Sequence, residues 1–219
     1  MDLGKFLADP DKLSVLERMS PPKTKRDVRK ILGFFGYFRD HIPNFAEIAL
    51  PLTDLTTKQY QKAIPWGEPQ QTAFENLKRA LKEATENPQY SVDFSKPFYL
   101  FTDASNYAVS GALTQMDKQG KYLPIAFSST KLTETQKKWS VIEKEAFAVL
   151  EALRKYRQWI FGTTLTVMSD HNPLTYLTHS VPKSAKLMRW ALALQEFSIN
   201  FEYYPGKKNI VADCLSRIV

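Results

Sequence analysis

The sequence has one cysteine, three histidines and no long apolar run among its 219 residues. The single cysteine, Cys214, excludes an intramolecular disulfide and indicates a reducing compartment. The first residues lack the apolar stretch of a secretory signal, and no segment is apolar for long enough to cross a membrane. We therefore expect a soluble, intracellular protein with no membrane partner.

The charge balance is basic but uneven. Apolar residues make up 43% of the chain and charged residues 24%, which are ordinary globular values, and the net charge is +7. Residues 91–219 hold 16 Lys and Arg against 11 Asp and Glu, or +5, whereas residues 1–90 hold 14 against 12, or +2. A basic surplus suits an enzyme that grips a phosphate backbone, although many solvated surfaces are as basic.

Four carboxylates occupy positions at which the predicted strands and helices would point their side chains toward one common site. Asp103 and Asp170 each end a run of aromatic and aliphatic residues typical of a buried strand. Glu145 lies one turn into a long helical pattern, and Asp213 lies in a short helical pattern near the C-terminus. The alternative is that these are four unrelated surface acids. That explanation is adequate for any one of the residues alone, but it explains all four in this order poorly.

Acids at the ends of hydrophobic strands are costly to bury unless something pairs with them. No cluster of cysteine and histidine accompanies these four. The predicted partner is therefore a hard divalent cation held by oxygen ligands, Mg²⁺ with Mn²⁺ as a substitute. No small-molecule cofactor is expected.

The first part of the chain, residues 1–88, reads as helical. Thr24 and Asp27 form a helix-start signature, and an apolar face at helical spacing follows in Val28, Ile31, Leu32, Phe35 and Phe38. Two further helices are predicted at 45–55 and 71–84. The segment Asn87-Pro88-Gln89 is the predicted hinge to a second domain, residues 95–219.

The second part alternates strand and helix patterns. Its predicted strands are 98–103, 107–115, 122–129, 165–169 and 199–204, and its predicted helices are 133–161, 172–178, 184–197 and 209–217. The core face of the long helix is predicted to hold Ile142, Phe147, Val149, Leu150 and Leu153. Three strands in a meander, followed by alternating helices and strands, indicate an α/β fold with a mixed sheet and flanking helices.

The long helix offers two glutamates, Glu143 and Glu145. Residues two apart on a helix point to different faces. Glu145 shares its face with Ala148, Val149 and Ala152, which is the face that would pack on the sheet. Glu145 is therefore the predicted site residue.

The residues around the four acids resemble a known family. The ribonuclease H domain of reverse transcriptases, most closely that of gypsy-type long-terminal-repeat retrotransposons, has motifs similar to Phe101–Ser105, Glu143–Ala146, Ser169–Leu174 and Asn209–Arg217. The thumb or connection segment of the same polyproteins has segments similar to Ile31–Arg39, Pro51–Leu55, Trp66–Gly67 and Gln70–Phe74. The resemblance covers nearly the whole chain in the expected order.

The resemblance implies a ribonuclease H-like fold preceded by a small helical thumb or connection module. It implies an endonuclease that hydrolyses the RNA strand of RNA–DNA hybrids with two metal ions. Asp103 would bridge both ions, Glu145 and Asp170 would hold the ion on the leaving-group side, and Asp213 would complete the other. The palm and fingers of the same polyprotein are a further expected partner.

The chain departs from the cellular enzymes in one loop. Cellular ribonucleases H carry a histidine before the last aspartate, but here the loop reads Tyr203-Tyr204-Pro205-Gly206-Lys207-Lys208-Asn209. Gypsy-type enzymes commonly have a tyrosine or another residue there, so activity is still expected. His171 directly follows Asp170, and a structural hydrogen bond is the preferred interpretation for it.

Six residues are candidates for contact with the duplex. Basic and aromatic residues interleave around Lys186, Arg189 and Trp190, and phosphate contacts from the two basic residues would set register. For Trp190 a place in the core is preferred. The full set of candidates is Ser105, Asn106, Lys186, Arg189, Lys207 and Lys208.

Three other functions are alternatives. A polymerase needs its own paired aspartates, and this chain has no adjacent Asp-Asp. An integrase orders its acids Asp, Asp, Glu, whereas the helix glutamate comes second here. The third is a domesticated or decayed fragment that only binds nucleic acid or protein, and the complete set of four acids argues against decay.

Overall fold

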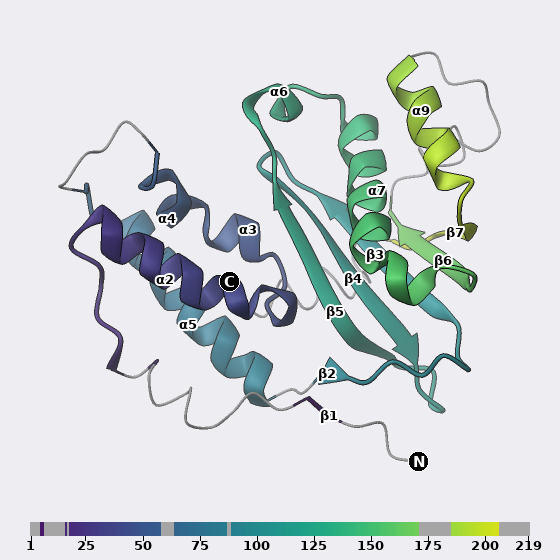
Figure 1. Cartoon of the computed structure of the whole chain (residues 1–219), viewed down its shortest axis with the longest axis horizontal. Coiled ribbons are helices and arrows are strands. Elements are labelled where there is room, and N and C mark those ends of the chain that lie inside the picture. The colour runs from purple at the N-terminus through teal and green to yellow at the C-terminus, as the bar shows by residue number, and fades with distance from the viewer. Residues whose placement is uncertain are drawn as a thin grey trace.

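A computed structural model describes residues 5–6, 16, 18–57, 64–86, 89–170 and 185–205. A group of helices from the N-terminal region lies beside a five-stranded sheet (Figure 1). The strand order is β5-β4-β3-β6-β7; β3 to β5 are antiparallel neighbours, and β6 and β7 run parallel to β3. The strands are β3 (Phe98–Ala104), β4 (Ala108–Met116), β5 (Tyr122–Lys131), β6 (Thr164–Ser169) and β7 (Ser198–Tyr203). The predicted mixed sheet is confirmed.

The helical pattern at 133–161 forms two helices, so the prediction of one long helix is wrong. Helix α6 spans Glu134–Lys137 and α7 spans Val141–Ile160. Ser140 starts α7 with its own capping box, because its Oγ accepts from the backbone N of Glu143 at 3.3 Å and Glu143 Oε2 accepts from the Ser140 N at 3.0 Å. The Ser-x-x-Glu signal is present in the sequence. Ile142, in the first turn, is 44% exposed, so its predicted place in the core is wrong.

Helix α7 lies across one face of the sheet, as Figure 1 shows. The other predicted core residues of this helix, Phe147, Val149, Leu150 and Leu153, are buried. A Cβ on Gly111 of β4 would meet the Cβ of Ala152 at 3.1 Å and Ser128 Oγ at 2.9 Å. The missing side chain therefore allows the helix to approach the sheet closely. Ala152 lies two turns after Glu145 on the same helix. The Gly111–Ala152 contact therefore sets how far Glu145 lies from the sheet.

The N-terminal helices are α2 (Lys25–Tyr37), the 3-10 turn η1 (Arg39–His41), α3 (Phe45–Ile48), α4 (Leu50–Asp54) and α5 (Glu68–Glu86). The start at Thr24 is confirmed, since its side chain accepts from the backbone N of Asp27 at 3.2 Å. The single helix predicted at 45–55 is wrong. It divides at Ala49, and Pro51, in the first turn of α4, has no N–H to continue the first helix.

Three smaller elements complete the described part. Strands β1 (Lys5–Phe6) and β2 (Gln89–Tyr90) pair antiparallel. Helix α9 (Ala185–Leu194) packs beside α7, where Trp190 is partly buried against the core. The helices predicted at 172–178 and 209–217 lie outside the described residues. Within those described, no helix is long and apolar enough to cross a membrane.

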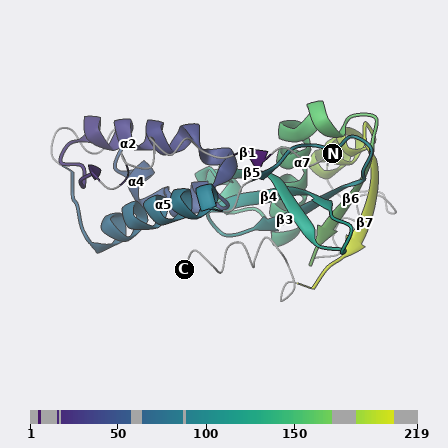
Figure 2. The same ribbon diagram turned by 90° about the horizontal axis from the view of Figure 1, so that it is seen from below.

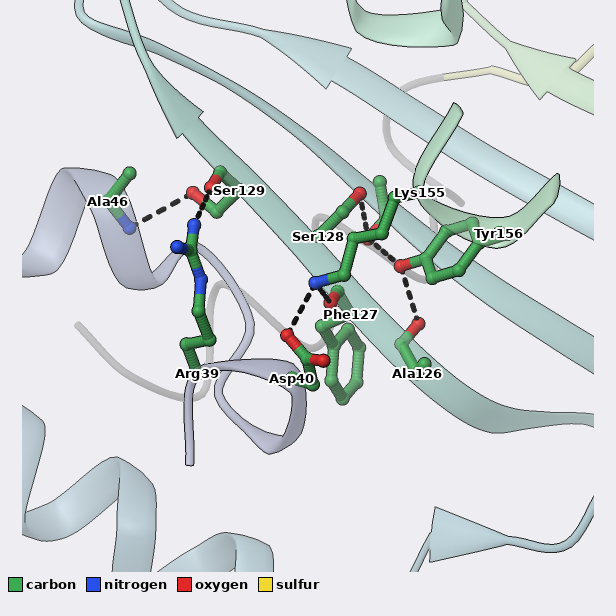
Figure 3. Close-up of polar contacts among 10 residues, drawn as sticks. Arg39, Asp40, Ala46, Ala126, Phe127, Ser128, Ser129, Lys155 and Tyr156 are labelled. Carbon is green, nitrogen blue, oxygen red and sulfur yellow. Dashed lines mark hydrogen bonds and ion pairs between the residues drawn. The ribbon is translucent and has the colours of Figure 1, made fainter. Parts of the chain in front are cut away.

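The N-terminal helices cover the free edge of β5. Figure 3 shows Arg39 Nη2 donating to the Ser129 carbonyl at 2.6 Å and the Ala46 N–H donating to Ser129 Oγ at 3.0 Å. Lys155 of α7 donates to the Phe127 carbonyl at 2.8 Å and to Asp40 Oδ1 at 2.5 Å. Outward-facing carbonyls of an edge strand are thus satisfied within the chain, which removes a site for strand pairing with other molecules.

The buried apolar residues fall into separate clusters. One cluster is confined to residues 16–81, and the others lie within 98–194. The two regions lie side by side when viewed from below (Figure 2), and the polar contacts at β5 join them. The proposed division near residue 88 stays a prediction, because Asn87 and Pro88 lie outside the described residues.

Lys155→Met should weaken this junction. Burial lowers the pKa of the Lys155 amine, and its hydrogen bond to Asp40 opposes that effect. The substitution leaves the Phe127 carbonyl and the Asp40 carboxylate without this donor, so we expect the free energy of unfolding to fall by about 1–3 kcal/mol in urea melts. Asp40→Asn should have a smaller effect, because the Asp40 side chain is 51% exposed. Lys118→Met, in an exposed turn, is the control, and equal stability of the two methionine variants would contradict the prediction.

Candidate active site

The strand register brings two of the predicted acids together. Strand β3 pairs in parallel with β6, from Phe98 opposite Leu165 to Phe101 opposite Met168. Asp103 follows the last paired residue of β3 by two positions, and Asp170 directly follows the end of β6. Both carboxylates are partly exposed at the carboxyl ends of their strands. Neighbouring parallel strands thus carry them to the same end of the sheet.

Glu145 completes the group from the helix above. Its side chain is 2% exposed, and burial, followed by the charges of Asp103 and Asp170, raises its pKa to about 8. A hydrogen bond from the backbone of Ala104 acts in the opposite direction. Three of the four predicted acids are therefore near enough for the charges of Asp103 and Asp170 to act on Glu145. Asp213 lies outside the described residues.

The chemistry of these side chains suits a hard cation. Carboxylate oxygens are the preferred ligands of Mg²⁺, and a cation between them would relieve the repulsion that raises the Glu145 pKa. Over the described ranges, however, no three Asp, Glu, His or Cys side chains stand close enough to hold a metal ion. The metal ions and their ligands therefore remain proposals.

Glu143 makes different contacts from Glu145. Besides capping α7, it forms an ion pair with Lys186 of α9. Lys186 Nζ lies 2.6 Å from Glu143 Oε1. Burial raises the pKa of Glu143, but hydrogen bonds from Lys186 and Ser140 outweigh it and lower that pKa. The amine of Lys186 also lies 3.9 Å from the ring centroid of Trp139. Lys186, a predicted phosphate contact, thus joins α9 to α7, while Arg189 is exposed and donates from Nε to the Ala185 carbonyl at 3.2 Å.

The turn after Asp103 holds two more candidates. Ser105 Oγ accepts from the backbone N of Tyr107 at 3.1 Å and of Ala108 at 3.0 Å, so its hydroxyl shapes the turn. Asn106 is exposed, and its Oδ1 accepts from Lys144 Nζ at 3.1 Å. Lys207 and Lys208 lie outside the described residues, as does His171. All six predicted duplex contacts stay predictions.

Glu47 is a neighbour of the site that the sequence did not reveal. Burial raises its pKa, a hydrogen bond from Ser105 lowers it, and the charge of Asp103 raises it further. Helix α3 of the N-terminal region therefore borders the acids of the sheet. Nothing in the local pattern marks Glu47, because more than fifty residues separate it from Asp103 and only the packing of the two regions joins them.

Comparison with known proteins identifies a matching family and several similar polyproteins. Residues 93–197 match the family described as the RNase H-like domain found in reverse transcriptase. The Retrovirus-related Pol polyprotein from transposon opus of Drosophila melanogaster is 37% identical over 96% of this chain and 22% of its own length. The Pol polyprotein from transposon 412 of the same organism is 39% identical over 97% and 17%. The chain thus spans about a fifth of the length of these relatives.

A solved structure is similar over most of the described elements. The foamy viral protease-reverse transcriptase in complex with an RNA/DNA hybrid superposes with a TM-score of 0.70 at 25% identity, covering 92% of this chain and 28% of that one. Together with the family match, this similarity identifies the mixed sheet with its flanking helices as a ribonuclease H-like fold preceded by N-terminal helices. Residues 93–197 form an RNase H-like domain of the kind found in reverse transcriptase, and the chain is similar to one part of the Pol polyproteins of long-terminal-repeat retrotransposons.

Proposed function

We propose that this chain is a ribonuclease H that cuts the RNA strand of RNA–DNA hybrids endonucleolytically with two Mg²⁺ ions. The observation that carries the proposal is the position of Glu145, a buried carboxylate whose pKa is raised by burial and by Asp103 and Asp170. A site built only for stability would gain nothing from three acids that repel one another. The binding of hybrid by the similar foamy viral enzyme supports the choice of substrate.

The four acids, Asp103, Glu145, Asp170 and Asp213, would hold the ions. When bound, the ions supply a nucleophilic water and stabilise charge on the phosphate and on the leaving oxygen. The chain itself contributes the placement of its carboxylates. Asp103 and Asp170 are fixed by adjacent parallel strands, and Glu145 is fixed by the close packing of α7 on Gly111. Mn²⁺ should substitute for Mg²⁺, because both accept oxygen ligands.

A labelled hybrid tests the proposal directly. Purified protein at enzyme excess should shorten the RNA strand in Mg²⁺ or Mn²⁺, leave the DNA strand whole and stop in EDTA. Intact RNA under these conditions would refute the proposal. Binding without cutting would instead identify a nucleic-acid binding module. In the longer polyprotein we expect the palm and fingers to present the hybrid to this domain.

The basic side of α2 should contribute to binding and not to cutting. Arg26, Arg29 and Lys30 are exposed, whereas the Lys25 amine donates to the Thr57 carbonyl at 2.5 Å. Replacing the three exposed residues by glutamine should weaken hybrid binding and make the log–log salt slope shallower, by up to about one unit for each phosphate that is no longer neutralised. The cutting rate at saturating hybrid should stay the same. An unchanged slope would show that this helix only packs against its neighbours.

A further inference from the structure

Lys144, next to Glu145 in the sequence, is a buried cation that the proposed chemistry does not use. Its side chain is 6% exposed at the start of α7. An ammonium group is costly to bury without hydrogen bonds. Its Nζ donates to Asn106 Oδ1 at 3.1 Å, in the turn three residues after Asp103. The helix that carries one of the acids is thus tied to the turn that follows another.

This contact fixes which way the Asn106 carboxamide faces. A lysine ammonium can only donate, so the atom facing it must be the amide oxygen. The NH₂ group is then held on the other side of the carboxamide, on a residue that is exposed. The turn itself is held by the Ser105 hydroxyl, which accepts from two backbone N–H groups. Asn106 therefore presents a donor of fixed direction in the turn that follows Asp103.

We propose that Lys144 is a positioning residue, which holds the Asn106 NH₂ group as a hydrogen-bond donor to an oxygen of the RNA backbone near the cut. The inference rests on the proposed function and deepens it, because it assigns a substrate contact and the residue that orients it. Phosphate oxygens and 2′-hydroxyls are both acceptors on that strand. If Lys144 only packed against its neighbours, its buried amine would not need to donate a hydrogen bond to an exposed amide.

A double-mutant cycle on hybrid binding in EDTA tests the inference without cutting. Lys144→Met keeps the length and apolar stem of the side chain but removes the donor, and Asn106→Ala removes the carboxamide. Each single variant should bind hybrid about five- to tenfold more weakly, the range for one missing hydrogen bond to a charged or polar partner. The double variant should bind no more weakly than the weaker single variant, because both changes remove one unit.

Two further variants separate orientation from charge and from folding. Lys138→Met removes the same charge from an exposed position just before α7 and should change affinity less than about twofold. Asn106→Asp keeps an acceptor for Lys144 but has no NH₂ group, so the buried amine stays paired while hybrid binding is weakened. In Mg²⁺, Lys144→Met should raise KM for hybrid and leave kcat nearly unchanged. The Asn106→Ala effect should vanish on a DNA duplex if the acceptor is a 2′-hydroxyl and persist if it is a phosphate.

The inference is wrong if Lys144→Met binds like wild type, if the two single effects add in full, or if Asn106→Asp binds normally. An effect of Lys138→Met as large as that of Lys144→Met would also overturn it, since charge alone would then explain the weaker binding. These outcomes are independent of the proposed function, because wild-type protein that binds hybrid but does not cut it would refute the nuclease and leave the binding cycle readable.

Discussion

Asp103→Asn should abolish cutting of hybrid RNA and leave the fold intact. The carboxamide keeps the shape of the side chain but removes a carboxylate charge that would help to hold the metal ions. Losing several kcal/mol of charge stabilisation lowers the rate by about a thousandfold or more. In EDTA the variant should melt at a higher temperature than wild type, because the charge of Asp103 acts on both Glu145 and Glu47.

Gel assays and thermal melts of the same preparations measure both effects. Asp117→Asn is the matched control, since Asp117 caps the turn between β4 and β5 and its amide oxygen can still accept from Gln119 and Lys121. Wild-type activity in Asp103→Asn would refute the assigned role. A lower melting temperature would show that Asp103 is held by stabilising contacts that outweigh its repulsion from the other acids.

The second large effect is the contrast between the two glutamates of α7. Glu145→Gln should lower the cutting rate by several orders of magnitude, because it removes a predicted metal ligand at the centre of the acids. Glu143→Gln should change the rate little, but it weakens the ion pair with Lys186 and the cap at Ser140. Its loss of stability should be about 1 kcal/mol. The reverse pattern of rates would show that Glu143 is the functional residue.

The pH dependence of stability separates these variants further. In metal-free protein Glu145 keeps its proton up to a pKa of about 8, whereas the unfolded chain loses it near the ordinary value of 4.5. Between these values the native state binds more protons, so stability falls as pH rises, by up to about 1.4 kcal/mol per pH unit. Glu145→Gln should therefore gain stability over wild type steadily from pH 5 to 8 in urea melts with EDTA.

Glu143 should behave in the opposite way. Its pKa is lowered in the folded protein, so its contribution to stability is fully present above the unfolded value and is lost only as pH falls through the folded one. The difference between Glu143→Gln and wild type should stay constant from pH 5 to 8. A flat difference for Glu145→Gln as well would mean that the buried carboxyl ionises normally.

The sequence by itself determined the five strands of the main sheet, the order of the acids and the phase of α7, but not the short pair β1 and β2. Alternation and apolar runs report which residues are buried, and a strand that ends in an acid carries that acid to the edge of its sheet. Helical spacing predicted that Glu145, and not Glu143, lies on the face of the helix toward the sheet, and Glu145 is buried. Local signals also placed the start of α2 at Thr24. The break at Ser140 was missed because the apolar pattern runs through it, although the capping box was there to be read.

Only the tertiary structure decided which residues meet across the chain. The Lys186–Glu143 ion pair, the Lys144–Asn106 hydrogen bond and the approach of Glu47 to Asp103 join residues far apart in sequence. Lysines look alike in a sequence whether they face solvent, a carboxylate or a phosphate, because a long flexible side chain can reach any of them. The raised pKa of Glu145 is also a tertiary property, since it arises from burial under α7 and from two aspartates carried by parallel strands.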